Sequence, residues 1–110
     1  MAEATNVTQQ KGRWQFQGLF SDMWTVEAEV DWGSLNSNTS ESASIAVPGL
    51  NPNTDFVLSF NREDDYTEHA MIEVAHIHTG YIHLLTHNTG GSPFNAPSTK
   101  YRFVVVRISV

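Results

Sequence analysis

The chain has 110 residues and a formal charge of −6, with 12 acidic and 6 basic side chains. Its length fits a single domain. The scattered bases argue against nucleic acid as the main ligand, because phosphate binding needs clustered Lys and Arg. The absence of cysteine excludes a disulfide, a thiolate metal site and a Cys nucleophile. We expect no membrane association, because no apolar run approaches the ~20 residues of a membrane span. We also expect synthesis in a cytoplasm, because the polar start is unlike a signal peptide.

The first third of the chain begins with a polar stretch and then alternates clearly. Residues 1–12 have no hydrophobic periodicity, and they predict an extended N-terminal arm ahead of a single domain over 13–110. Trp14 and Phe16 alternate with polar residues, which indicates a short strand. A longer alternation predicts a strand with one apolar face and one acidic face. The apolar face carries Trp24, Val26, Ala28, Val30 and Trp32, and the other carries Thr25, Glu27, Glu29 and Asp31.

Turn-forming residues divide the middle of the chain into short apolar runs. Residues 33–39 predict a loop by composition, and residues 43–47 predict a strand that ends at a Pro-Gly turn. Alternating apolar residues over 55–60 predict the next strand. Residues 61–69 are highly charged, which favours a solvated loop.

The last third of the chain predicts a hairpin, a long turn and a terminal strand. Residues 71–78 and 81–87 are two strands that meet at Thr79-Gly80. Glycines and prolines over 89–99 predict a long turn, and the β-branched run over 101–110 predicts a final strand. The total of about seven or eight short strands is typical of an antiparallel β-sandwich or jelly roll.

Histidines are concentrated in the predicted hairpin. With a two-residue turn at Thr79-Gly80, His76 faces His83 and His78 faces Tyr81, so the three imidazoles share one face. His87 lies further along that face, and the opposite, core-like face carries Ala75, Ile77, Ile82 and Leu84. A His-x-His pair with a cross-strand His can hold zinc and leave a position open for reactive water. The alternative, which we favour, is a polar outer face or imidazoles packed at a subunit contact, where they could make assembly pH-dependent. We therefore predict no metal and no cofactor, with His76, His78 and His83 as the metal candidates.

Other combinations of reactive residues are weak in this sequence. Asp64, Asp65 and Glu68 lack the spacing of a calcium loop, and the serines at 40, 42 and 44 have no neighbouring base motif. Gly90-Gly91 precedes a proline, as in a turn, and does not form a phosphate-binding loop. We therefore predict no catalytic residues and no enzymatic activity.

The predicted strands and turns from Trp24 onward follow an order that points to one class of protein. An alternating strand leads to a Val-Pro-Gly end, an Asp-led apolar strand, a hairpin, an Asn-Thr-x-Gly turn and an aromatic-led final strand. This order resembles a β-sandwich module of structural proteins in tailed bacteriophages. The charged loop over 61–69 and the hairpin histidines depart from the module. The matching blocks are residues 26–32, 45–49, 55–58, 72–84, 88–92 and 101–106.

The resemblance implies a non-enzymatic virion structural protein that decorates and stabilises the capsid exterior. Such a capsid decoration protein is made in the host cytoplasm, binds the major capsid protein and self-associates as a dimer or trimer. Two alternatives are a carbohydrate-binding β-sandwich module on a virion or tail fibre, which needs exposed aromatic residues, and a small His-metal (zinc) protein. The expected assembly contacts lie in the arm and the charged loop: Glu3, Asn6, Gln9, Gln10, Arg62, Asp64, Asp65 and Tyr66.

Overall fold

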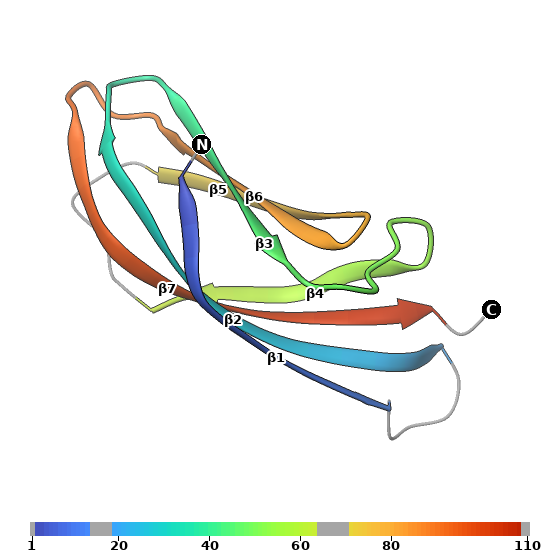
Figure 1. Cartoon of the computed structure of the whole chain (residues 1–110). Coiled ribbons are helices and arrows are strands. Elements are labelled where there is room, and N and C mark those ends of the chain that lie inside the picture. Colours follow the sequence, from blue (N-terminus) through green and yellow to red (C-terminus); the bar gives the residue numbers. More distant parts are fainter. Residues whose placement is uncertain (1, 14–18, 64–70, 109–110) are drawn as a thin grey trace.

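The computed structural model describes residues 2–13, 19–63 and 71–108, and it confirms the all-β fold class (Figure 1). The described residues form two antiparallel sheets, with strand orders β1-β2-β7-β4 and β3-β6-β5. The predicted strand at Trp14 and Phe16 lies outside the described residues. The strands are β1 (Glu3–Arg13), β2 (Phe20–Leu35), β3 (Ser40–Ala46), β4 (Asp55–Arg62), β5 (Met71–His78), β6 (Tyr81–Asn88) and β7 (Phe94–Ile108).

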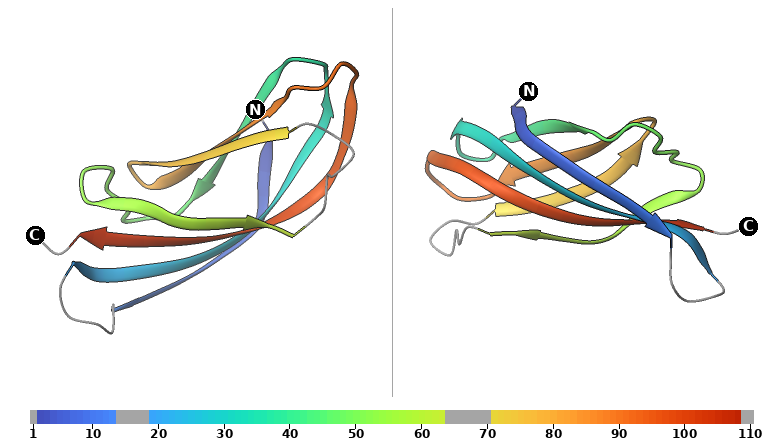
Figure 2. Two further views of the ribbon diagram at one scale, coloured as in Figure 1. Left: turned by 180° about the vertical axis from the view of Figure 1, so that it is seen from behind. Right: turned by 60° about the horizontal axis from the view of Figure 1, so that its bottom comes forward.

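The described part of the chain is elongated, with principal extents of 48 × 22 × 22 Å. Two long strands, β2 and β7, bend along their length, so that the four-stranded sheet curves around the three-stranded sheet (Figures 1 and 2). The edge strands β4 and β5 lie beside each other, and Arg62 of β4 forms an ion pair with Glu73 of β5. This pair joins the two sheets along one side of the molecule.

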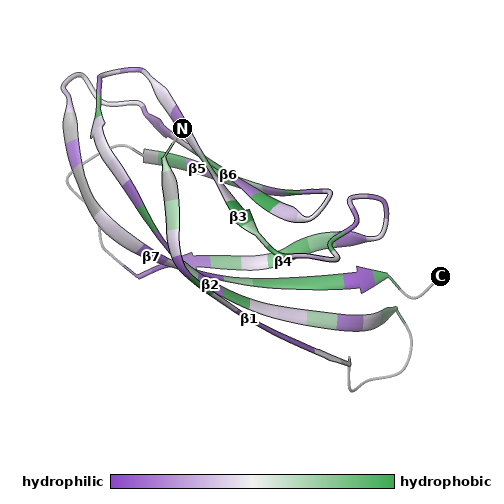
Figure 3. Ribbon diagram, viewed as in Figure 1, coloured by the Kyte–Doolittle hydropathy of each residue, from purple (hydrophilic) through white to green (hydrophobic). Residues whose placement is uncertain are grey.

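The core lies between the two sheets, as the alternation in β2 predicted. Every apolar residue on the inward face of β2 is at most 4% exposed, whereas Asp31 on the outward face is exposed. The colouring in Figure 3 shows a mostly polar β1 at one edge of the four-stranded sheet and hydrophobic residues in the C-terminal part of β7. Burial of such apolar faces is the main stabilising contribution in a sandwich of this size. The same core cluster includes the inward side chains of β3, β6 and β7, namely Ala43, Ile45, Ile82, Leu84, Tyr101, Phe103 and Val105.

Strands β2 and β7 are longer than the sequence predicted, and the loops between strands are correspondingly shorter. Gly33 pairs with Ala96 and Leu35 pairs with Phe94, so parts of the predicted 33–39 loop and 89–99 turn are strand. The prolines in this region misled the prediction. Pro97 is tolerated because, among the described residues, β4 pairs with β7 between Tyr101 and Arg107, and β2 is the one described neighbour of β7 at that point.

The predicted extended N-terminal arm is not confirmed, because residues 3–13 form the edge strand β1. This strand pairs with β2 from Glu3↔Asp31 to Arg13↔Asp22. The Ala2 N–H also donates a hydrogen bond of 2.7 Å to the Ser42 carbonyl of the other sheet. Hydrophobic periodicity is absent because the side chains from residue 5 to residue 12 are exposed, so no face of the strand needs apolar residues.

Candidate metal centre

The β5–β6 hairpin has the register that the two-residue turn predicted. His76 pairs with His83, His78 pairs with Tyr81, and Gly80 has a φ of 80°. The inward residues Ile82 and Leu84 are fully buried, so the histidines lie on the outward face. Ladder geometry alone therefore places the imidazoles of His76, His78 and His83 together.

The tip of this hairpin is held in place by the turn that follows β3. The Gly80 N–H donates to the Leu50 carbonyl at 3.0 Å, and the Gly80 carbonyl accepts from the Val47 N–H at 2.9 Å. Both backbone groups of Gly80 are therefore bonded to the turn segment that runs from Val47 to Leu50. This anchoring fixes the position of the histidine-bearing strands before any ligand binds.

Replacing Gly80 with alanine should lower the free energy of unfolding by about 1–2 kcal/mol, because a φ of 80° is unfavourable for any residue with a Cβ. The space around a Cβ at this position is open, so the cost comes from the backbone alone. Urea denaturation measures the change. Gly12→Ala is the matched control, because Gly12 also has open space but no positive φ. Equal losses in the two variants would contradict this explanation.

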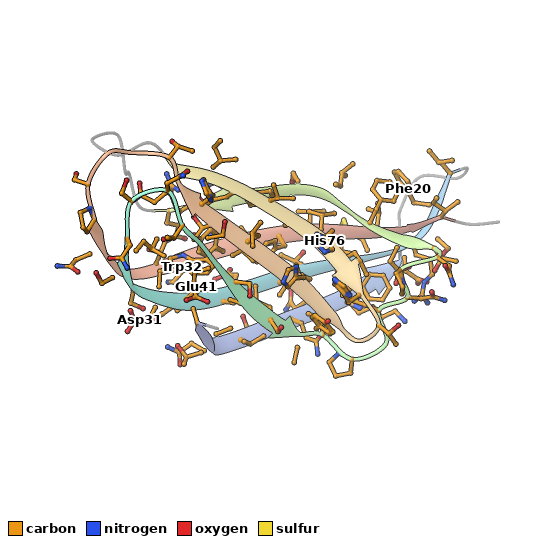
Figure 4. All side chains as sticks on the ribbon, turned by 90° about the horizontal axis from the view of Figure 1, so that it is seen from above. Phe20, Asp31, Trp32, Glu41 and His76 are labelled. Carbon is orange, nitrogen blue, oxygen red and sulfur yellow. The ribbon has the colours of Figure 1, made fainter. Side chains whose placement is uncertain are left out.

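The three imidazoles approach one another closely on the outward face of β5 and β6. Nε2 of His76 lies 2.9 Å from Nε2 of His78 and 3.2 Å from Nδ1 of His83. One nitrogen from each ring can be chosen so that all three lie within 4.8 Å of one another. Figure 4 looks onto this sheet and labels His76. The rings therefore converge on a common point instead of pointing apart into solvent.

The surroundings of the three histidines are neutral. The ring of Tyr81 stacks on His78, with centroids 4.8 Å apart and an interplanar angle of 3°. Among the described residues, the outward face of the three-stranded sheet carries no acidic or basic side chain besides histidine. That face consists of Ser40, Ser42, Ser44, Ala46, Ile72, Val74, His76, His78, Tyr81, His83, Leu85 and His87.

Burial of the ring lowers the pKa of His76 below its ordinary value, and the neighbouring His83 and His78 lower it further. The protonated ring is disfavoured because it would lose hydration and lie beside two other rings that compete for protons. His76 is therefore neutral at neutral pH, with a ring nitrogen available as a ligand.

His87 is separated from the other three histidines. Its Nδ1 lies 2.6 Å from the Ser40 hydroxyl, and its Nε2 lies 3.2 Å from Oδ1 of Asn38. The sequence analysis missed this Ser–His contact, because Ser40 and His87 are far apart in the chain and meet only through the β3–β6 register. Asn38 carries no charge, so it stabilises a protonated imidazole less than the aspartate of a catalytic triad does.

The predicted assembly contacts fall in three different settings. Asn6, Gln9 and Gln10 are exposed on β1, and Glu3 begins that strand. Arg62 faces the other sheet, where it pairs with Glu73. Asp64, Asp65 and Tyr66 lie outside the described residues. The role of all eight residues in assembly remains a prediction.

Comparison with protein families, with curated proteins and with solved structures found no match. Within the described ranges, no helix is long and apolar enough to cross a membrane. The function must therefore be argued from the geometry of this chain.

Proposed function

We propose that this chain is a non-enzymatic virion structural protein that decorates and stabilises the capsid exterior of a tailed phage. In this role it contacts the major capsid protein and further copies of itself, as a dimer or trimer. The observation that carries the proposal is a set of exposed apolar side chains on the neighbouring strands β4 and β5. Their exposed fractions are 37% for Phe56, 48% for Leu58, 58% for Ile72 and 48% for Val74.

The outward position of two of these side chains follows from the alternation of β4 around the inward Val57, and a register shift comes directly after it. The register with β7 shifts between Val57 and Ser59, which leaves Leu58 as the extra residue of a bulge. Val57 packs against the core, whereas Phe56 and Leu58 face solvent. Phe56 and Leu58 point outward from the four-stranded sheet, and Ile72 and Val74 point outward from the three-stranded sheet, along the side where the two edge strands lie beside each other. Exposed large apolar residues are a feature of protein contact surfaces.

The residues that carry the phage resemblance are structural braces, which supports a stiff scaffold. The Asn88 side-chain amide lies 3.1 Å from the carbonyls of Leu35 and Ser92, and its oxygen accepts from the Gly90 N–H at 2.9 Å. Asp55, which leads β4, is buried against Arg107. A protein that reinforces a shell needs such rigidity and a complementary surface, and it needs no deep pocket.

The carbohydrate-binding alternative gains no support from two of the tryptophans that could form its surface. It requires aromatic side chains in an exposed row, but Trp24 is 2% exposed and Trp32 is 4% exposed. Trp14 lies outside the described residues. The metal-binding alternative uses the same outward face of the three-stranded sheet that carries Ile72 and Val74, and it is compatible with a structural role.

The proposal is tested by quantitative mass spectrometry of purified particles of a phage whose genome encodes this chain. We expect a copy number comparable to that of the major capsid protein, because a decoration protein covers the shell. A trace amount would contradict capsid decoration in favour of a tail, fibre or vertex component. Complete absence would contradict any virion role.

A variant pair tests whether β5 supplies the contact surface. Ile72→Thr with Val74→Thr removes exposed apolar area but keeps β-branched residues in the strand. We expect weaker binding to purified shells with unchanged thermal stability. Val7→Thr is the matched control, because Val7 is 36% exposed on β1, which is an edge strand of the other sheet. Equal binding by the β5 double variant and the control would contradict a contact through β5.

A further inference from the structure

We propose that His76, His78 and His83 bind one divalent transition-metal ion of the zinc class through three imidazole nitrogens. The fourth coordination position faces solvent and is open to water or to a donor from a contacting partner. This site is independent of the capsid role proposed above, because it requires only the β5–β6 hairpin.

The separations between the nitrogens suit a tetrahedral ion. Zn–N bonds of about 2.0–2.1 Å place two tetrahedral ligands about 3.3 Å apart. The two close separations here, from Nε2 of His76 to the nitrogens of His78 and His83, are 2.9 and 3.2 Å. All three nitrogens lie within 4.8 Å of one another, so rotations of the side chains of His78 and His83 would bring the third pair to the tetrahedral separation.

Hydrogen bonding accounts poorly for the same geometry. A ring nitrogen offers one in-plane site, which is either one proton or one lone pair. Nε2 of His76 nevertheless lies close to two other ring nitrogens. At most one of these contacts can be a well-directed hydrogen bond, whereas an ion at the point of convergence uses the lone pairs of all three rings.

The donor set decides the class of metal. Imidazole nitrogens suit zinc, copper, nickel and iron, whereas calcium and magnesium take oxygen ligands. No carboxylate shares this face in the described part of the chain. A cation that prefers oxygen ligands therefore has no carboxylate ligand among the described residues of this face. These residues also leave the charge of a bound ion without a neutralising partner, so the fourth position can take an anionic or a neutral ligand.

The supporting structure is preorganised. All three histidines come from regular strands in one hairpin, with His76 directly opposite His83. The stacked Tyr81 restricts the ring of His78, and the two hydrogen bonds of Gly80 hold the hairpin tip. Ligands on rigid strands with restrained rings lose little freedom on binding, which favours affinity.

Zinc titration of the full chain tests the site. The protein is purified without a polyhistidine tag, stripped with a chelator and titrated with Zn²⁺ against a chromophoric competitor. We expect one ion per chain, and a loss of affinity of more than about tenfold in His76→Ala and in His83→Ala, since loss of even indirect support costs about 10–100-fold. Substitution with Co²⁺ should give the visible spectrum of a four-coordinate site.

His87→Ala is the matched control, because it removes another imidazole from the same face. The two nitrogens of His87 already contact Ser40 and Asn38. Its zinc affinity should equal that of the parent chain. Circular dichroism without metal checks folding, and His83→Gln replaces any alanine variant that fails to fold. Unchanged affinity in the His76 and His83 variants, or an equal loss in His87→Ala, would overturn the proposal.

Discussion

Replacing Asp55 with asparagine should lower the free energy of unfolding by about 3 kcal/mol, because it removes a buried, hydrogen-bonded carboxylate while leaving its cation partner behind. The Asp55 side chain is fully buried, and it accepts hydrogen bonds from Arg107 Nε at 2.7 Å and Arg107 Nη2 at 3.0 Å. It also accepts from the Asn51 N–H at 2.8 Å and the Thr54 hydroxyl at 3.0 Å. An asparagine keeps the shape but turns an N–H₂ group toward these donors.

The position of Arg107 explains why the loss should be large. Its guanidinium lies 4.9 Å from the centroid of the Trp24 ring and donates to the Gly49 carbonyl at 2.9 Å. Asp55 therefore holds the cation that covers the end of the core and joins the turn before β4 to β7. Loss of the carboxylate frees all of these contacts together.

Asp22→Asn is the matched control for this prediction. Its carboxylate also lies near Arg107, at 3.9 Å, but 26% of the side chain is exposed. A part-exposed pair at that distance contributes at most about 1 kcal/mol. Urea denaturation of both variants at neutral pH makes the comparison. A loss in Asp55→Asn no greater than in Asp22→Asn would contradict the assigned role.

The same carboxylate should make the protein acid-sensitive. Burial acts to raise the pKa of Asp55, but the hydrogen bonds from Arg107, Asn51 and Thr54 outweigh it, so the pKa lies below its usual value. The unfolded chain therefore binds this proton first as the pH falls. The stabilisation is complete above the unfolded pKa of about 3.9 and is lost as the pH falls toward the lower folded pKa. Asp55→Asn should flatten this part of the stability profile.

The fold and the histidine cluster could be predicted from sequence where local signals were sufficient. The β2 alternation identified its buried face because a period of two has a single interpretation when one side is apolar. Thr79-Gly80 set the hairpin register because a two-residue turn leaves only one pairing. The partnership of His76 with His83 followed from that register.

Other features depend on contacts between distant segments, and the sequence carried no local sign of them. The polar strand β1 has no alternation to detect, because its side chains are exposed. The convergence of the imidazole nitrogens depends on side-chain rotamers, which the register does not determine. Asp55 and Arg107 are 52 positions apart, and only the pairing of β4 with β7 brings them together.

Replacing Tyr101 with phenylalanine should cost about 2 kcal/mol, because its hydroxyl links two buried polar groups. Trp32 Nε1 donates to this hydroxyl at 2.9 Å, and the hydroxyl in turn donates to the Glu73 carboxylate. Arg62 pairs with the same carboxylate, so the chain of contacts crosses from β2 and β7 to β5 and β4. Phenylalanine fills the same space but leaves the Trp32 N–H without an acceptor in the core.

A double-mutant cycle separates this network from simple loss of packing. Tyr81→Phe is the control, because Tyr81 is half-buried on the outward sheet face, and it should change stability by less than about 0.5 kcal/mol. Glu73→Gln and Tyr101→Phe should each be destabilising, but the double variant should lose less than their sum, since the first change weakens the contact that the second removes. Strict additivity would show that the two groups act independently. The junction of the sheets would then depend on apolar packing alone.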